Sequence, residues 1–175
     1  VYDSDIVITH MPAQNHAGRD LANFRKQIAQ GRQLSRRLYG MYARELFLAG
    51  ETRDFLEAED YFRAEVSSPD RSADEITEGC CVAARAARLR GDTVTFFKYT
   101  SKVIAGDGCS EICCELGYFY EETGDFEEAA VWYYNAAYET QPVLALRSSE
   151  EEPLQGLIRC YEQLGLPAQA RSYEE

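Results

Sequence analysis

The sequence predicts an all-α fold, an α-solenoid of about four helix pairs with a short N-terminal extended segment. A repeat is the first reason: Cys80–Cys81 and Gly91–Asp92 recur 33 residues later as Cys113–Cys114 and Gly124–Asp125. A fixed period of this length is typical of stacked helix–turn–helix units. The second reason is composition, because 45% hydrophobic residues, including 12 tyrosines and 8 phenylalanines, give these 175 residues enough apolar surface for a core.

The expected elements follow from apolar residues at helical spacing and from the positions of Gly and Pro. The short β-branched run at 5–9 is expected to be extended. Prolines support the helix boundaries, because Pro69, Pro142, Pro153 and Pro167 fall in connections or first turns. Helices are expected near residues 20–30, 36–49, 55–66, 74–90, 94–105, 110–123, 126–140, 154–164 and 168–174.

The clearest repeat unit spans residues 110–142. Gly117 lies on the inner face of its first helix and is expected to let the second helix approach closely. Gly124 is expected to end the first helix in the left-handed conformation, and Asp125 is expected to cap the second. The other units lie near 34–69, 77–106 and 153–175.

These units divide the chain into residues 1–17, a remnant of a preceding domain with its linker, and a helical repeat domain at 18–175. Two units depart from the clearest one. In the unit at 77–106, Phe96 occupies a position where a small residue is usual. In the unit at 34–69, the turn between the helices is expected to carry about two extra residues.

The 110–142 unit resembles a tetratricopeptide repeat (TPR), with Cys113 where that pattern prefers Trp. The order of segments resembles the C-terminal TPR region of bacterial family 2 glycosyltransferases: a short strand ending in His10, a basic helix, Tyr-Ala-Arg-Glu-Leu at 42–46, then repeats. The resemblance implies that the chain is part of a longer transferase with a nucleotide-sugar-binding domain and a divalent metal. His10 then matches a late metal ligand of that longer protein, whereas this part itself needs no cofactor. Asp3 and Asp5 form a D-x-D at the wrong end for the family's metal motif.

The net charge is −12, which makes nucleic acid and anionic membrane surfaces poor partners, and no apolar run is long enough for membrane insertion. The charge is unevenly distributed. Residues 1–50 contain seven basic and four acidic residues, a balance of +3, so the remaining residues carry −15. The basic stretch at 19–44 is either a solvated helix face or a docking surface for an adjoining domain.

The six cysteines are expected to be buried packing residues in a reducing, cytoplasmic environment. The sequence contains no C-x-x-C pair, and His10 and His16 lie far from the cysteines, so zinc binding is disfavoured. The sequence also contains no nucleophile elbow, phosphate loop or H-E-x-x-H motif, so we expect no catalysis by this part of the protein.

Binding is therefore the expected function. In TPR arrays the first helix of each unit lines a groove, and here such a groove would hold charges of both signs, suited to a protein or peptide partner. The alternative is an ordinary polar surface. Three roles stay open: a transferase tail that positions an acceptor or self-associates, a stand-alone scaffold that binds a peptide, and a structural array that packs on the parent's own catalytic domain. The candidate groove residues are Glu78, Arg85, Arg88, Glu111, Tyr118, Glu121, Glu122 and Arg159.

Overall fold

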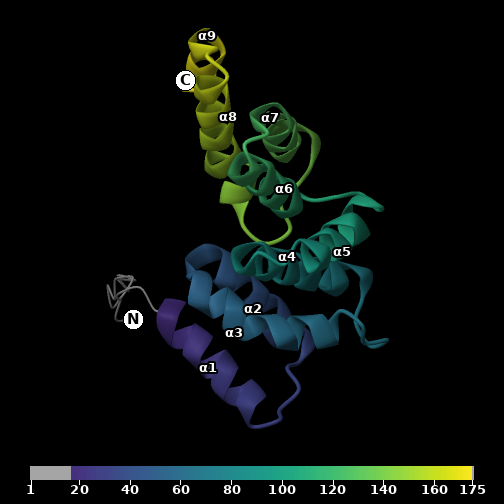
Figure 1. The fold of residues 1–175 in the computed structure, drawn as a ribbon. Helices are drawn as coiled ribbons and strands as arrows, with labels where there is room; N and C mark the ends of the chain where they lie inside the picture. The colour runs from purple at the N-terminus through teal and green to yellow at the C-terminus, as the bar shows by residue number, and fades with distance from the viewer. Residues whose placement is uncertain (1–16, 175) are drawn as a thin grey trace, which may run out of the picture.

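The computed structural model describes residues 17–174, which form a stack of helices (Figure 1). The predictions for the extended segment 5–9, for Asp3–Asp5 and for His10 lie outside the described residues. Within residues 17–174 every regular element is helical, which confirms the all-α prediction. The search of the described helices found none that is both long and apolar enough to cross a membrane.

The helix boundaries agree closely with those predicted. The helices are α1 (Ala17–Ala29), α2 (Arg36–Ala49), α3 (Thr52–Glu65), α4 (Ala73–Arg90), α5 (Thr93–Ile104), α6 (Ser110–Thr123), α7 (Phe126–Tyr134), α8 (Glu151–Gln163) and α9 (Pro167–Arg171). A π-helical segment, η1 (Asn135–Glu139), continues α7, and a 3₁₀ turn, η2 (Leu146–Ser148), lies in the long connection before α8.

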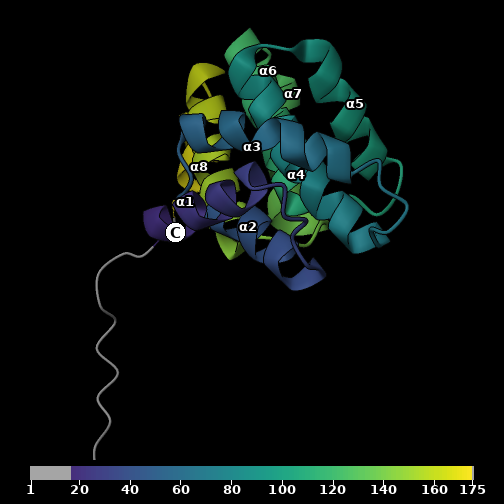
Figure 2. The same ribbon diagram turned by 90° about the horizontal axis from the view of Figure 1, so that it is seen from below.

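The even-numbered helices form an unbroken row, because α2 packs on α4, α4 on α6 and α6 on α8. The odd-numbered helices α3, α5 and α7 each pack on the even helix that follows, and α5 and α7 also pack on the even helix that precedes them (Figures 1 and 2). The connection between η1 and α8 crosses toward α2, so segments far apart in sequence meet beside the row. The row of even helices positions the candidate site.

The helix turns follow the predicted chemistry. Gly124 adopts φ +82° and ends α6, and the Asp125 side chain accepts a hydrogen bond from the backbone N–H of Glu128 at 3.1 Å. Asp92 caps α5 in the same way, accepting from Thr95 N–H at 3.0 Å. The prediction of two extra residues between the helices of the first unit is wrong. Gly50 and Glu51 alone separate α2 from α3, because Glu51 caps α3 in a capping box and the helix begins at Thr52.

Close packing at the C-terminal end depends on two glycines that face one tyrosine. Tyr133 of α7 is fully buried between Gly117 of α6 and Gly156 of α8. A Cβ atom built on either glycine would lie 2.6 Å from the Tyr133 ring, which is closer than atoms can pack. The predicted close approach at Gly117 is thus present, and the structure adds the matching approach at Gly156.

Candidate partner-binding groove

The predicted groove residues lie on the row of even helices, but most of them are paired with one another. Arg85 and Arg88 lie on α4, Glu121 and Glu122 on α6 and Arg159 on α8. Ion pairs join these three helices, and Glu152 of α8 also pairs with Arg147 of the 142–147 loop. We call this set the charge ladder: Arg85, Arg88, Glu115, Glu121, Glu122, Arg147, Glu152 and Arg159.

The first part of the charge ladder joins α4 to α6 through Glu115, a fully buried carboxylate that the sequence analysis did not select. Arg88 Nε donates to Glu115 Oε2 at 2.7 Å, and Arg85 Nε lies 3.2 Å from Glu115 Oε1. The Arg88 guanidinium also pairs with Glu122 and lies 5.0 Å from the centre of the Tyr118 ring. Burial alone would lower the pKa of Arg88, but Glu115 and Glu122 raise it, so the cation is firmly held.

The second part joins α6 to α8. Arg159 donates from Nε and Nη2 to the two oxygens of Glu121, at 2.7 and 2.8 Å, and the Tyr133 hydroxyl donates to the same carboxylate at 2.7 Å. Burial raises the pKa of Glu121, but these donors outweigh it and hold the pKa below its usual range. Glu121 and Arg159, which the sequence analysis proposed as groove residues, therefore satisfy each other.

Glu111 has a different role from the one predicted. Its side chain is fully buried, and its carboxylate accepts hydrogen bonds from the backbone N–H groups of Val143, Leu144 and Ala145 at 2.7 to 3.1 Å. Such bonds to a charged acceptor are stronger than neutral ones. Glu111 thus anchors the loop at 142–147 to the start of α6 and exposes no surface to a partner.

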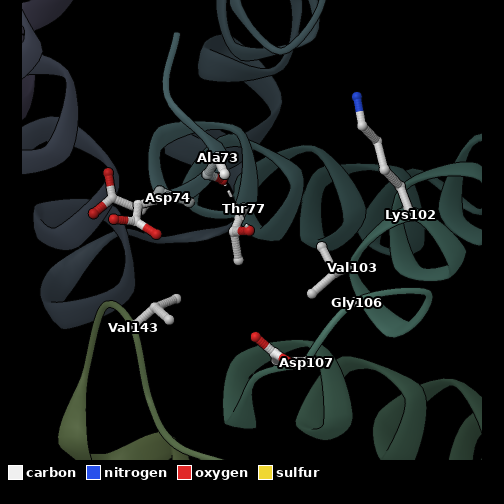
Figure 3. Close-up of a pocket in the computed structure, with 10 residues that line it drawn as sticks. Ala73, Asp74, Thr77, Lys102, Val103, Gly106, Asp107 and Val143 are labelled. Carbon is white, nitrogen blue, oxygen red and sulfur yellow. Dashed lines mark hydrogen bonds between the residues drawn. The ribbon is translucent and has the colours of Figure 1, made fainter.

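Glu78 is the predicted residue that lines an open hollow. This hollow of about 540 Å³ lies between α4, the end of α5 and the 142–147 loop, and Asp74, Thr77, Asp107 and Val143 also line it (Figure 3). Lys102 also lines the hollow, and Figure 3 shows its ammonium directed away from Asp107. Burial raises the pKa of Glu78, and nearby Arg44 opposes that shift.

Two further hollows join the first. One of about 510 Å³ lies between α2 and α4 and shares Asp74 and Glu78 with it. The other, of about 460 Å³, lies between α2 and the 142–147 loop and shares Val143 with the first and Arg44 with the second. We call these three joined hollows the α2–α4 groove. It is open to solvent, whereas the charge ladder beside it is internally neutralised.

Residues of α2 and of the 142–147 loop line this groove and were not among the predicted groove residues, although Arg37 and Arg44 belong to the basic stretch at 19–44. Arg37, Met41, Arg44 and Leu48 form an exposed stripe on α2 at positions i, i+4, i+7 and i+11. The spacing was visible in the sequence. The signal was missed because the weak TPR match of the first unit gave no reason to assign its first helix to the groove.

The basic stretch at 19–44 contains both paired and unpaired cations. Arg25 forms ion pairs with Asp54 and Glu57, and Arg36 lies 3.0 Å from Glu75. Among the residues that the structure describes, Arg37 and Arg44 have no ion-pair partner within 4.0 Å. Two of the cations on α2 are therefore available to an external partner.

The cysteines are buried packing residues, as predicted. All six are free and buried, and burial raises the pKa of the Cys80 and Cys113 thiols to about 11. One group resembles a metal site: ligand atoms of Cys81, Cys109 and Glu111 lie within 4.8 Å of one another. Its chemistry does not fit a metal, because the Glu111 oxygens are occupied by backbone N–H groups and burial favours protonated thiols.

Residues 17–174 thus form an all-helical structure with the open α2–α4 groove, and a separate hollow lies beside α7 and α8 at Val131, Tyr134 and Leu166. No family model matches the chain, and neither a curated protein nor a solved structure matches it.

Proposed function

We propose that this chain is a TPR-like helical-repeat domain that binds a protein or peptide and performs no catalysis itself. The observation that carries the proposal is the open α2–α4 groove beside the row of even helices. Alternation of odd and even helices, with Gly–Asp turns at 91–92 and 124–125, also supports the assignment to this fold class.

The groove suits an extended macromolecular segment better than a small metabolite. It is three shallow joined hollows on one surface, whereas pockets for small molecules enclose most of their ligand. Its lining contains carboxylates, arginines and apolar side chains, which are the groups that recognise peptides. The 142–147 loop that forms one wall is fixed by Glu111, so the groove needs little ordering on binding.

Selection of random peptides displayed on phage against the purified chain tests the binding function. We expect enrichment of related peptides whose affinities can be measured in solution. Failure of every selected peptide to bind the free protein would contradict the proposal.

We also propose that the chain belongs to a family 2 glycosyltransferase, on the basis of the segment order in which a basic helix and Tyr-Ala-Arg-Glu-Leu at 42–46 precede the repeats. In that setting the groove would position a protein acceptor, and nucleotide sugar and metal would bind elsewhere in the protein. The genomic sequence upstream of Val1 tests this. We expect a nucleotide-sugar domain with a D-x-D motif, and an open reading frame that starts near Val1 would refute the assignment.

A further inference from the structure

The α2 stripe alternates cationic and apolar side chains along one helix face. Arg37 and Arg44 are exposed cations, and Met41 and Leu48 are exposed to 45% and 52%. Because a helix rises 1.5 Å per residue, the two arginines are about 10 Å apart along the axis. The stripe therefore offers two positive charges with an apolar side chain between them.

The 142–147 loop continues this pattern on the opposite wall of the groove. Leu146 is 69% exposed and Val143 is 36% exposed, and at the end of the same hollow stands Arg147, which pairs with Glu152 in the charge ladder. Four of the eleven large apolar side chains that the described residues expose line the groove. Exposed apolar side chains gathered in one place mark an interaction site, whereas scattered ones do not.

We propose that this half of the groove binds an acidic peptide segment of a partner protein, with apolar side chains between its carboxylates. The inference rests on the proposed function and adds to it the site and the chemistry of the partner. Carboxylates of the peptide would meet Arg37 and Arg44, while an apolar side chain would enter the hollow between Leu48 and Leu146. Charge complementarity supports this occupant, because both arginines lack an ion-pair partner among the described residues although the chain has a net charge of −12.

The acidic half of the groove disfavours an anionic membrane as the occupant. Asp74 and Glu78 of α4 line the wall that faces the arginines across the same hollow, and Asp107 lies in the adjoining one, so a broad anionic surface that reached the arginines would also meet these carboxylates. A narrow peptide can follow the basic wall and avoid them. The carboxylates also orient the peptide, because they repel any acidic residue of the peptide that lies away from the α2 stripe.

Fluorescence anisotropy with designed peptides tests the inference. The probe is a short fluorescein-labelled peptide in which Glu, Leu, Glu and Leu repeat the spacing of the α2 stripe. Two comparison peptides replace both glutamates by lysine or both leucines by serine. We expect the probe to bind the protein at least about tenfold more tightly than either comparison peptide. Equal binding of the probe and the lysine peptide would overturn the inference.

Protein variants locate the site. Arg37→Glu with Arg44→Glu should weaken binding of the probe by about tenfold or more, whereas Lys98→Glu with Arg171→Glu makes the same change in charge away from the groove and should leave it unchanged. Circular dichroism checks that each variant folds. If the arginine variant does not fold, Leu146→Ser replaces it in the binding measurement and should weaken binding of the probe. Val94→Ser is its control, because both side chains are highly exposed. Unchanged binding by the folded arginine variant, or by Leu146→Ser, would contradict the proposed site.

Two additional measurements separate the alternatives. Binding to phosphatidylserine vesicles that depends on Arg37 and Arg44, without binding of the probe, would replace the peptide by a membrane as the occupant. Phage-selected peptides that bind the protein but lack acidic residues would refute this inference and leave the proposed function intact. The same holds for selected peptides that bind the arginine variant as tightly as the wild type. If no peptide binds at all, both proposals fail.

Discussion

Tyr133 shows how single residues fix the approach of the helices. Its ring fills the space that Gly117 and Gly156 leave open, and its hydroxyl donates to Glu121, which Arg159 holds in turn. The ring is thus held on both faces and at its tip, so it has no room to move aside. The sequence indicated the small residue at 117 from the repeat pattern. It did not indicate Gly156, because Gly156 packs on Tyr133 of the preceding unit, and the pattern within one unit does not report contacts between units.

Replacing Gly117 by Ala should therefore destabilise the protein. In a helix with room for a methyl group this substitution would be stabilising, but here the new Cβ would lie 2.6 Å from Tyr133 Cε1. We expect a loss of about 1–3 kcal/mol in the free energy of unfolding, measured by urea denaturation. Gly106→Ala is the control, because its Cβ would have no neighbour nearer than 3.6 Å. A Gly117→Ala protein as stable as wild type would show that the two helices can separate.

Glu111 is a second residue whose role depends on tertiary structure. Glu111→Gln should lower the free energy of unfolding by about 1–3 kcal/mol. The backbone N–H groups of the 142–147 loop donate to both carboxylate oxygens, and glutamine replaces one of these acceptors by an NH₂ donor. Urea denaturation again measures the change, and Glu150→Gln, at an exposed position, is the control. The anchoring role would be refuted if the two variants had the same stability.

At the level of elements, local chemistry predicted most of the fold, since caps and glycines act within a few residues. The boundaries of α2 and α6 agree with the prediction, whereas α3 begins earlier than expected because a Glu51–Asp54 capping box was not recognised. The groove was predicted less well. Which charges pair and which remain open depends on contacts between residues about 27 to 38 positions apart, as for Arg88–Glu115 and Glu121–Arg159, and no local pattern reports them.

The start of α4 yields a prediction about pH. Burial raises the pKa of Glu75, but hydrogen bonds from Ser72 and Arg71 and the charge of Arg36 lower it by more. The pKa therefore falls from 4.5 to about 2. A carboxylate with a depressed pKa stabilises the fold above its unfolded pKa and loses this effect as the pH falls through its folded pKa. The melting temperature of wild type should therefore exceed that of Glu75→Gln by a constant amount above pH 4.5. The difference should shrink as the pH falls toward about 2.

Thermal melts followed by circular dichroism over this pH range check the prediction. Glu127→Gln serves as the control, because Glu127 is exposed and lies in the first turn of α7 without a tertiary ion pair within 4.0 Å among the described residues. Its melting curve should follow that of wild type. A difference between wild type and Glu75→Gln that stays constant down to pH 2 would show that the carboxylate charge does not stabilise α4.

Residues 17–174 form a stack in which α4 lies in the middle and α9 at one end. α4 packs on α2, α3, α5 and α6 and carries a long series of fully buried residues, whereas α9 packs mainly on α8. In such an array the free energy of local opening depends on the number of neighbouring helices, because an end helix can detach without disturbing the centre.

Hydrogen exchange followed by mass spectrometry should reveal this gradient. We expect amide protection to decrease from α4 through α6 and α8 to α9. The opening free energy of α4 should approach that of global unfolding, and that of α9 should be near zero, because few buried contacts hold the five-residue helix. Peptides that cover residues 73–90 and 167–171 allow the direct comparison. Equal protection at both sites would mean that the stack unfolds as one cooperative unit, and the description of these helices as nearest-neighbour repeats would then be wrong.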